Sequence, residues 1–284
     1  MHFSTLVDTD TLRENLDNTR WVVFDCRFSL KKPTEGREKY DAGHIPGARY
    51  ADLDRNLSCP KRADTGRHPL PDFKEFDGWL RGNGVNRDSQ VVVYDDVGGV
   101  IAGRLWWMLR MLGHRDVAVL DGGWQAWTRD SHAVSTEVSV PAAGNFEGRP
   151  KKDSWVTTAQ VEQLLDNVGK RAPLIDARAA PRFRGEKEPI DPVAGHVPGA
   201  LNRPCDDNLD DQGLFLPADR LRQDFDGILA GADAGEVIHM CGSGVSACHN
   251  ILAMELAGWP ATRLYVGSWS EWITDPAREI RTSP

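Results

Sequence analysis

The segment "HMCGSGVSACH", residues 239–249, gives one cysteine the setting of a reactive nucleophile. Cys241 follows a short apolar run and precedes a loop with glycines at 242 and 244, after which a helical pattern begins. Such a loop can curl its backbone N–H groups around an anion, and the positive end of the helix dipole adds to their effect. The same environment stabilises a thiolate over a thiol. We therefore predict that Cys241 is a thiolate nucleophile that can carry a persulfide.

Two weaker interpretations of Cys241 give it a different role. Cysteine is often a small buried residue without chemistry. A cysteine between a strand and a helix also occurs in phosphatases, whose loop needs an arginine at the sixth position after the cysteine to hold phosphate oxygens. Here that position is Ala247, and the loop contains no lysine or arginine. Phosphate ester chemistry is therefore disfavoured.

The sequence motifs around the segments expected to position Cys241 occur twice in the chain. Three motifs recur at about half the chain length: "FDCR" (24–27) as "IDAR" (175–178), "DAGHIPGA" (41–48) as "VAGHVPGA" (193–200), and "DGGWQAW" (121–127) as "VGSWSEW" (266–272). A repeat of this period indicates a duplicated domain. We predict domains at 1–138 and 154–284, joined by a polar, Pro- and Gly-containing linker at 139–153.

Each half alternates short apolar strand patterns with amphipathic helical patterns. This alternation predicts an α/β fold in which a parallel sheet has helices on both faces. Ligands of such sheets bind beyond the carboxyl ends of the strands, and Cys241 lies at one of those ends. Aligning "VVVYDD" with "VIHMCG" places Asp95 opposite Cys241. We therefore predict that the first copy is catalytically silent.

Composition excludes several classes of function. The chain has 284 residues, a formal charge of -8 and no cationic run, which argues against nucleic acid or an anionic membrane as a partner. No window approaches the roughly 18 apolar residues of a membrane-spanning helix, and the first residues lack a signal-peptide pattern. Five scattered cysteines do not suggest a disulfide framework. We expect a cytoplasmic protein with free thiols.

These residues resemble the tandem-domain rhodanese family, and more closely its 3-mercaptopyruvate sulfurtransferases. The resemblance is carried by "CGSGVSAC", both "GHIPGA"/"GHVPGA" motifs, "DARAAPRFRG" and "GSWSEW". It implies two tandem rhodanese-like domains and a reaction in two halves. Cys241 would take sulfur from 3-mercaptopyruvate as a persulfide and release pyruvate, and a thiol such as thioredoxin, or cyanide, would then remove that sulfur.

The resemblance also assigns roles to individual residues. Arg182, in "PRFRG", would bind the carboxylate of the substrate. A second arginine of the family is replaced here by Ile190, and Arg184 or Lys187 are the candidates to substitute for it. A Ser/His/Asp set that handles a proton as pyruvate leaves is resembled by Ser243, His68 and Asp54. Four residues of the loop after Cys241 would line the donor site: Gly242, Gly244, Val245 and Ser246.

Several alternative assignments stay open at this point. Ser243 could instead cap the following helix, and His68 and Asp54 could be ordinary loop residues. The protein could be a thiosulfate:cyanide sulfurtransferase, a persulfide carrier that turns over no small donor, or an inert interaction domain. The spacing of His239, Cys248 and His249 does not fit a zinc site, so we expect no metal. We also expect no organic cofactor, and a monomer.

Overall fold

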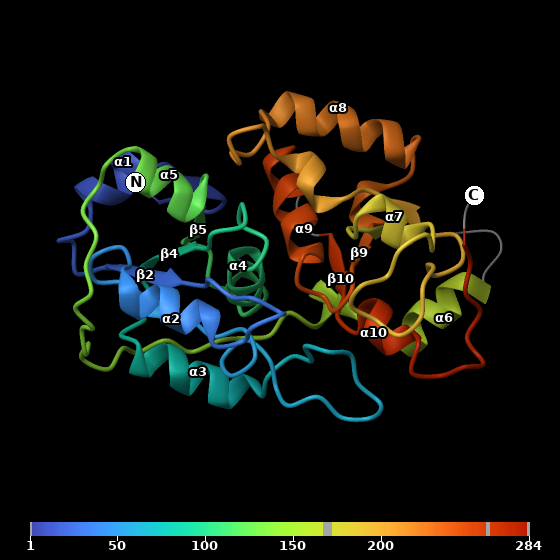
Figure 1. The fold of residues 1–284 in the computed structure, drawn as a ribbon, viewed down its shortest axis with the longest axis horizontal. Helices are drawn as coiled ribbons and strands as arrows, with labels where there is room; N and C mark the ends of the chain where they lie inside the picture. The colour runs from blue at the N-terminus through green and yellow to red at the C-terminus, as the bar shows by residue number, and fades with distance from the viewer. Residues whose placement is uncertain (1, 167–171, 260–261, 283–284) are drawn as a thin grey trace. The chain divides into compact units, whose positions relative to one another are not determined.

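The structure is a computed structural model that describes residues 2–166, 172–259 and 262–282 (Figure 1). The chain forms two compact units, each with its own sheet. The first comprises Met1–Cys59, Leu70–Lys151 and Asp211–Phe215, and the second comprises Pro60–Pro69, Lys152–Asp210 and Leu216–Pro284. Residues 136–151 form no helix or strand, and the boundaries at 138 and 154 stay a prediction. The short segment 60–69 thus packs with the second unit.

The first unit is a parallel five-stranded sheet in the order β1-β5-β4-β2-β3. Every neighbouring pair in it is parallel, as the alternation of strand and helix patterns predicts. Its strands are β1 (Leu6–Val7), β2 (Trp21–Asp25), β3 (Arg49–Tyr50), β4 (Gln90–Tyr94) and β5 (Val117–Leu120). Its helices are α1 (Thr9–Glu14), α2 (Glu35–Ala42), α3 (Phe73–Gly82), α4 (Ala102–Met111) and α5 (Gly123–Arg129).

The second unit repeats this topology in the order β6-β10-β9-β7-β8, also all parallel. Its strands are β6 (Trp155–Val156), β7 (Leu174–Asp176), β8 (Leu201–Asn202), β9 (Ile238–Met240) and β10 (Arg263–Tyr265). Its α-helices are α6 (Thr158–Asp166), α7 (Ala180–Phe183), α8 (Ala218–Leu229), α9 (Ala247–Leu256) and α10 (Ser268–Trp272), with 3-10 turns η1 (Lys152–Ser154), η2 (Cys205–Asn208) and η3 (Ala234–Glu236). The predicted α/β fold with two like domains is confirmed.

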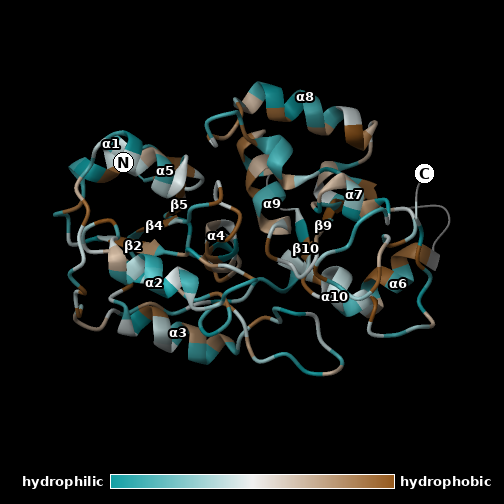
Figure 2. Cartoon of the chain, in the orientation of Figure 1, coloured by the Kyte–Doolittle hydropathy of each residue, from teal (hydrophilic) through white to brown (hydrophobic). Residues whose placement is uncertain are grey.

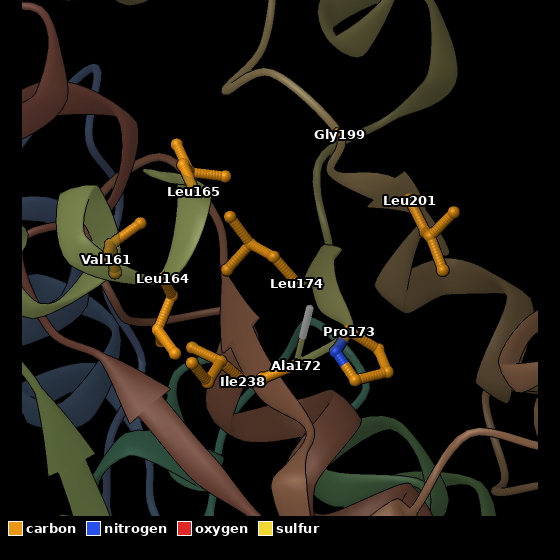
Figure 3. Close-up of a pocket in the computed structure, with 9 residues that line it drawn as sticks. All are labelled: Val161, Leu164, Leu165, Ala172, Pro173, Leu174, Gly199, Leu201 and Ile238. Carbon is orange, nitrogen blue, oxygen red and sulfur yellow. The ribbon is translucent and has the colours of Figure 1, made fainter. Parts of the chain in front are cut away.

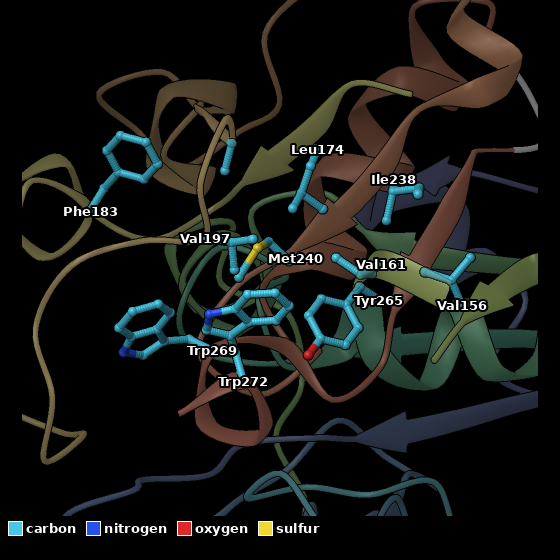
Figure 4. Close-up of a cluster of buried hydrophobic side chains, with 11 residues drawn as sticks. Val156, Val161, Leu174, Phe183, Val197, Ile238, Met240, Tyr265, Trp269 and Trp272 are labelled. Atoms are coloured by element: carbon cyan, nitrogen blue, oxygen red, sulfur yellow. The ribbon is translucent and has the colours of Figure 1, made fainter. Parts of the chain in front are cut away.

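Alternation along β9 shows how the second sheet is covered on both faces. Ile238 and Met240 belong to a buried cluster that includes Trp269 and Trp272 of α10 and Val161 of α6 (Figure 4). The residue between them points the other way, because His239 Nε2 lies 3.2 Å from the sulfur of Met254 in α9. Helices α6 and α10 therefore cover one face, and α9 covers the opposite face.

Helix α8 packs on the outer side of α9 and shows the pattern of a surface helix. Its buried residues Leu221, Phe225 and Leu229 recur every four positions, so they form one stripe. Figure 2 shows hydrophilic residues along much of the rest of α8. In contrast, α9 is buried over Ala247–Met254, since it lies between the sheet and α8.

One apolar cavity of about 190 Å³ lies at the amino ends of the second sheet's strands (Figure 3). Leu174, Leu201 and Ile238 are the first residues of β7, β8 and β9, whereas Cys241 follows the last residue of β9. Among the described residues, nine line the cavity: Val161, Leu164, Leu165, Ala172, Pro173, Leu174, Gly199, Leu201 and Ile238. None of these nine is titratable, and Cys241 lies at the other end of the sheet.

Candidate active site

Cys241 lies directly after β9 and is almost fully buried, with 2% of its surface exposed. The backbone N–H of Ser243 donates to its Sγ at 3.5 Å. The Cys241 N–H donates to the hydroxyl of Ser268 at 3.1 Å, and its C=O accepts the N–H of Trp269 at 3.0 Å. These bonds fix the backbone on both sides of the sulfur. A side chain held in this way does not have to be ordered before it can react.

The loop from Cys241 curls into the amino end of α9, as the sequence predicts. Gly244 has a φ of +73°, a left-handed conformation that favours glycine, and it lets the loop turn. Val245 is buried, and Ser246 is the residue that precedes α9, although its side chain makes no capping bond. The predicted loop residues Gly242, Gly244, Val245 and Ser246 therefore connect Cys241 to the helix terminus.

The corresponding loop of the first unit holds a carboxylate, which shows what such a loop can bind. Asp95 follows β4 as Cys241 follows β9. Its Oδ1 accepts the N–H groups of Val97 at 2.9 Å and Gly99 at 2.8 Å, and its Oδ2 accepts those of Ile101 at 2.7 Å and Ala102 at 2.8 Å. Complete burial raises the pKa of Asp95, and the four backbone bonds act against that rise.

His68 and Ser243, far apart in sequence, form a buried pair close to Cys241. His68 Nδ1 lies 2.7 Å from Ser243 Oγ, and both residues are less than 5% exposed. The segment that carries His68 is anchored because the N–H of Gly66 donates to Glu271 Oε2 and that of Arg67 to Ser270 Oγ. The Ser243 hydroxyl thus bonds to an imidazole, so the alternative that it caps α9 is not the observed arrangement.

Asp54 is placed differently from His68 and Ser243. It is an exposed residue in the loop after β3, within the first unit, and its N–H donates to Asp52 Oδ1 at 2.9 Å. Its assignment to the proton-handling set stays a prediction.

Arg182 lies in α7 and is held by two carboxylates. Its Nε donates to both oxygens of Glu188 at 3.0 Å, and its Nη2 lies 2.8 Å from Glu188 Oε1 and 3.1 Å from Asp191 Oδ2. Burial acts to raise the pKa of Glu188, but the bonds from Arg182 and from the N–H groups of Asp191 and Ile190 outweigh it, and the pKa is lowered. Glu188 is therefore an anion that fixes the direction of the Arg182 guanidinium.

A second guanidinium reaches the same place from a residue that sequence reasoning did not select. Arg67 Nη1 donates to Asp191 Oδ1 at 2.6 Å, while Arg182 takes Oδ2. A methyl group built on Gly242 would lie 3.0 Å from Arg67 Nη2 and 3.6 Å from Arg182 Nη2. Both guanidinium groups thus lie over the residue next to Cys241. The only local signal was that Arg67 precedes His68.

The cations proposed to substitute at Ile190 have different surroundings. Arg184 forms a bidentate ion pair with Glu186, at 2.7 and 3.0 Å, on the surface. Lys187 and Ile190 are exposed.

Ser268 is a second residue that the sequence did not reveal. It is fully buried and has a φ of +52°, which is rare for a residue with a side chain. Its hydroxyl donates to the C=O of Tyr265 at 2.8 Å while it accepts the N–H of Cys241. Strained backbone of this kind is concentrated at functional sites. Ser268 therefore links the β10–α10 turn to the backbone of Cys241.

Among the described residues, no group of three or more His, Cys, Asp or Glu side chains is arranged to hold a metal ion. His239 is one of the residues that raised the question of a metal. It lies in the core, where burial lowers its pKa to about 3. None of the five cysteines, all of which lie among the described residues, forms a disulfide. Within the parts of the chain that the structure describes, no helix is long and apolar enough to cross a membrane.

A comparison with protein families finds the rhodanese-like domain twice, at residues 8–130 and 157–275. The two ranges cover β2–β5 and β7–β10 with the α-helices of each unit, and the first strand of each sheet, β1 or β6, directly precedes its range. Full-length relatives carry names of two kinds. A protein of Pseudomonas aeruginosa named probable 3-mercaptopyruvate sulfurtransferase is 48% identical over 99% of both chains. The thiosulfate sulfurtransferase of Mus musculus is 34% identical over 99% of this chain and 96% of its own length.

Two solved structures have the same arrangement of elements. A 3-mercaptopyruvate sulfurtransferase from Leishmania major superposes with a TM-score of 0.82 and 31% identity, over 95% of this chain and 74% of that one. SseA from Escherichia coli, described with the 3-mercaptopyruvate sulfurtransferases, superposes with a TM-score of 0.79 and 32% identity, over 94% of this chain and 99% of that one.

Proposed function

The chain belongs to the rhodanese-like domain family, and on that basis we propose that it moves sulfane sulfur from 3-mercaptopyruvate through a persulfide on Cys241 to a thiol or to cyanide. It is a sulfurtransferase enzyme whose substrates are a small sulfur donor and a sulfur acceptor. The catalytic set is Cys241, Ser243, His68 and Asp54. The donor binds through Arg182 and the loop residues Gly242, Gly244, Val245 and Ser246.

In the first half-reaction the Cys241 thiolate attacks the sulfur of 3-mercaptopyruvate. The new S–S bond forms as the bond between sulfur and C3 breaks, and the electron pair of that bond leaves with pyruvate as its enolate. The N–H of Ser243, which donates to Cys241 Sγ, supports an anionic sulfur at this place. The four N–H groups around Asp95 support it further, since the same kind of loop holds a buried carboxylate there.

The enolate must receive a proton on carbon to become pyruvate, and the bond between His68 and Ser243 is the observation that carries the proposal. An imidazole bonded to a hydroxyl beside the nucleophile can deliver a proton near neutral pH. Thiosulfate would release sulfite, a stable anion that needs no such proton. The pair therefore favours mercaptopyruvate as the donor. Asp54 is proposed to orient His68, as the family resemblance implies.

Arg182 supplies the contact to the carboxylate of the donor. Its bonds to Glu188 and Asp191 use Nε and Nη2, and Nη1 takes no part in them. A guanidinium held in one direction loses less conformational freedom when it binds a second carboxylate. A persulfide carrier has no use for such a contact.

In the second half-reaction an acceptor thiolate attacks the outer sulfur and restores Cys241. Cyanide in the same role yields thiocyanate, and we propose a thioredoxin-like thiol as an acceptor in the cell. Five cysteines without a disulfide fit a reducing compartment, so the cytoplasm is the proposed location. A monomer is the proposed state, because one chain carries both copies of the domain.

The test compares pyruvate release from 3-mercaptopyruvate with thiocyanate formation from thiosulfate and cyanide, each as kcat/KM. We expect a clear preference for mercaptopyruvate. A clear preference for thiosulfate would contradict the proposal and support the alternative named by the mouse relative. Formation of a Cys241 persulfide from another protein without pyruvate release would support the carrier instead.

A further inference from the structure

Beyond the catalytic set, we propose that Arg67 is the second donor-binding arginine of this site and that it binds, together with Arg182, the carboxylate of the sulfur donor. This inference rests on the proposed function. The position that holds the family's second arginine is Ile190 here, and its side chain is exposed and carries no charge. Arg67 brings a guanidinium to the site from segment 60–69.

The first support is that Arg67 and Arg182 bind the same carboxylate, that of Asp191. Asp191 is almost fully buried at its side chain and gives one oxygen to each arginine, Oδ1 to Arg67 and Oδ2 to Arg182. The shared carboxylate sets the distance between the two guanidinium groups. Their Nη2 atoms both lie against the space over Gly242. In mercaptopyruvate only two carbon atoms separate the sulfur from the carboxylate carbon, so donors next to Cys241 are at the required range.

The second support is an unused donor. Among the described side chains, Arg67 Nε is buried and has no hydrogen-bond partner. A buried donor without a partner is unfavourable, and a ligand oxygen would remove that cost. A planar carboxylate can accept from two donors of one guanidinium, which a lysine at this place would not match.

The third support is the space itself. The backbone of Gly242 does not need the left-handed conformation, so conformational freedom does not explain a glycine there. A side chain at 242 would instead meet Arg67 Nη2, Arg182 Nη2 and Asp191 Oδ2 within 3.7 Å. Glycine at this position therefore keeps the two guanidinium groups close to the nucleophile.

The experiment combines variants of Arg67 with two sulfur donors, one that has a carboxylate and one that lacks it. The variants are Arg67→Gln and Arg67→Lys, with Arg62→Gln as the matched control, because Arg62 lies on the same segment with a 72% exposed side chain. The donors are 3-mercaptopyruvate and 1-mercaptopropan-2-one, which has a methyl group in place of the carboxylate. Thiocyanate formed at saturating cyanide gives kcat/KM, and the inhibition constant of pyruvate gives a second readout of carboxylate binding.

For Arg67→Gln we expect kcat/KM for mercaptopyruvate to fall about 10- to 100-fold, with a matching rise in the inhibition constant of pyruvate. The value for mercaptopropanone should stay within about twofold of the wild type. For Arg67→Lys we expect kcat/KM for mercaptopyruvate to lie between the values of Arg67→Gln and the wild type. Arg62→Gln should match the wild type in every assay.

Two results overturn the inference. One is an Arg67→Gln enzyme with unchanged kcat/KM for mercaptopyruvate and unchanged pyruvate inhibition. The second is an equal loss with both donors, which would mean that Arg67 only supports the folded site. A wild-type enzyme that releases no pyruvate from mercaptopyruvate would instead contradict the proposed function, so the two failures are distinct.

Discussion

His68 Nδ1 lies 2.7 Å from the hydroxyl oxygen of Ser243, although 175 positions separate the two residues in the sequence. Both are buried, and the contact exists because segment 60–69 packs into the second unit. A histidine and a serine in this relationship can pass a proton, and the nucleophile Cys241 is two residues from the serine.

A double-mutant cycle tests this pair. His68→Ala and Ser243→Ala should each lower kcat for pyruvate release about 100-fold, since each removes the proton donor. The double variant should lose little more, because the two residues act as one unit. Turnover of thiosulfate, whose leaving group needs no proton, serves as the control and should fall much less. Fully additive losses would show that the pair does not act together.

Cys241→Ser should abolish both persulfide formation and pyruvate release. Intact mass spectrometry after addition of mercaptopyruvate should show the gain of one sulfur atom, about 32 Da, on the wild type and none on the variant. Cys26→Ser is the matched control, because Cys26 also follows a strand of its sheet. Burial, with the charges of Asp95 and Asp25, raises the pKa of the Cys26 thiol. A sulfur gained by Cys241→Ser would exclude Cys241 as the carrier.

Asp95→Ala should destabilise the first unit without removing activity. The change leaves four backbone N–H groups without their acceptor, two from buried and two from part-buried bonds, which we expect to cost about 3 kcal/mol of unfolding free energy. Urea denaturation measures the loss, and pyruvate release at temperatures where the variant is folded measures activity. An Asp95→Ala protein as stable as the wild type would show that the carboxylate does not hold this loop.

Gly242→Ala should weaken donor binding while the protein stays folded. The added methyl group would lie 3.0 Å from Arg67 Nη2, the end of a flexible side chain that can shift. We expect KM for mercaptopyruvate to rise roughly 3- to 10-fold with little change in Tm. Gly227→Ala in α8 is the control, because a methyl group there meets no atom within 4 Å. An unchanged KM would mean that the space over Gly242 is not used.

His239 should make stability depend on pH. Burial lowers its pKa to about 3, whereas an unfolded chain has a histidine pKa of about 6.5. Between these values only the unfolded state binds the proton, so the unfolding free energy falls as pH falls, by up to about 1.4 kcal/mol per pH unit. His239→Leu should reduce that slope in urea denaturation between pH 4 and 6.5.

The control for this prediction is His2→Gln, since the His2 side chain is 70% exposed. Its slope should equal that of the wild type. A His239→Leu protein with the wild-type slope would mean that another group causes the pH dependence.

Local patterns in the sequence were sufficient for the fold and for the position of Cys241 at the end of a strand. Alternation of strand and helix patterns predicts parallel sheets, and the end of "VIHM" places Cys241 at a carboxyl edge because the main chain connects them directly. The duplicated motifs likewise predict two units with one strand order. Each of these conclusions depends on residues that are neighbours in sequence.

The rest of the candidate site depends on packing between distant segments, which no local pattern encodes. Arg67 lies in a loop of the first repeat, yet its contacts to Asp191 arise from the packing of segment 60–69 in the second unit. The role of Ser243 was ambiguous in sequence, and only the position of His68 shows that the Ser243 hydroxyl bonds to an imidazole. The sequence by itself therefore determined the fold and the prediction that Cys241 is the nucleophile, and the tertiary structure decided which side chains surround Cys241.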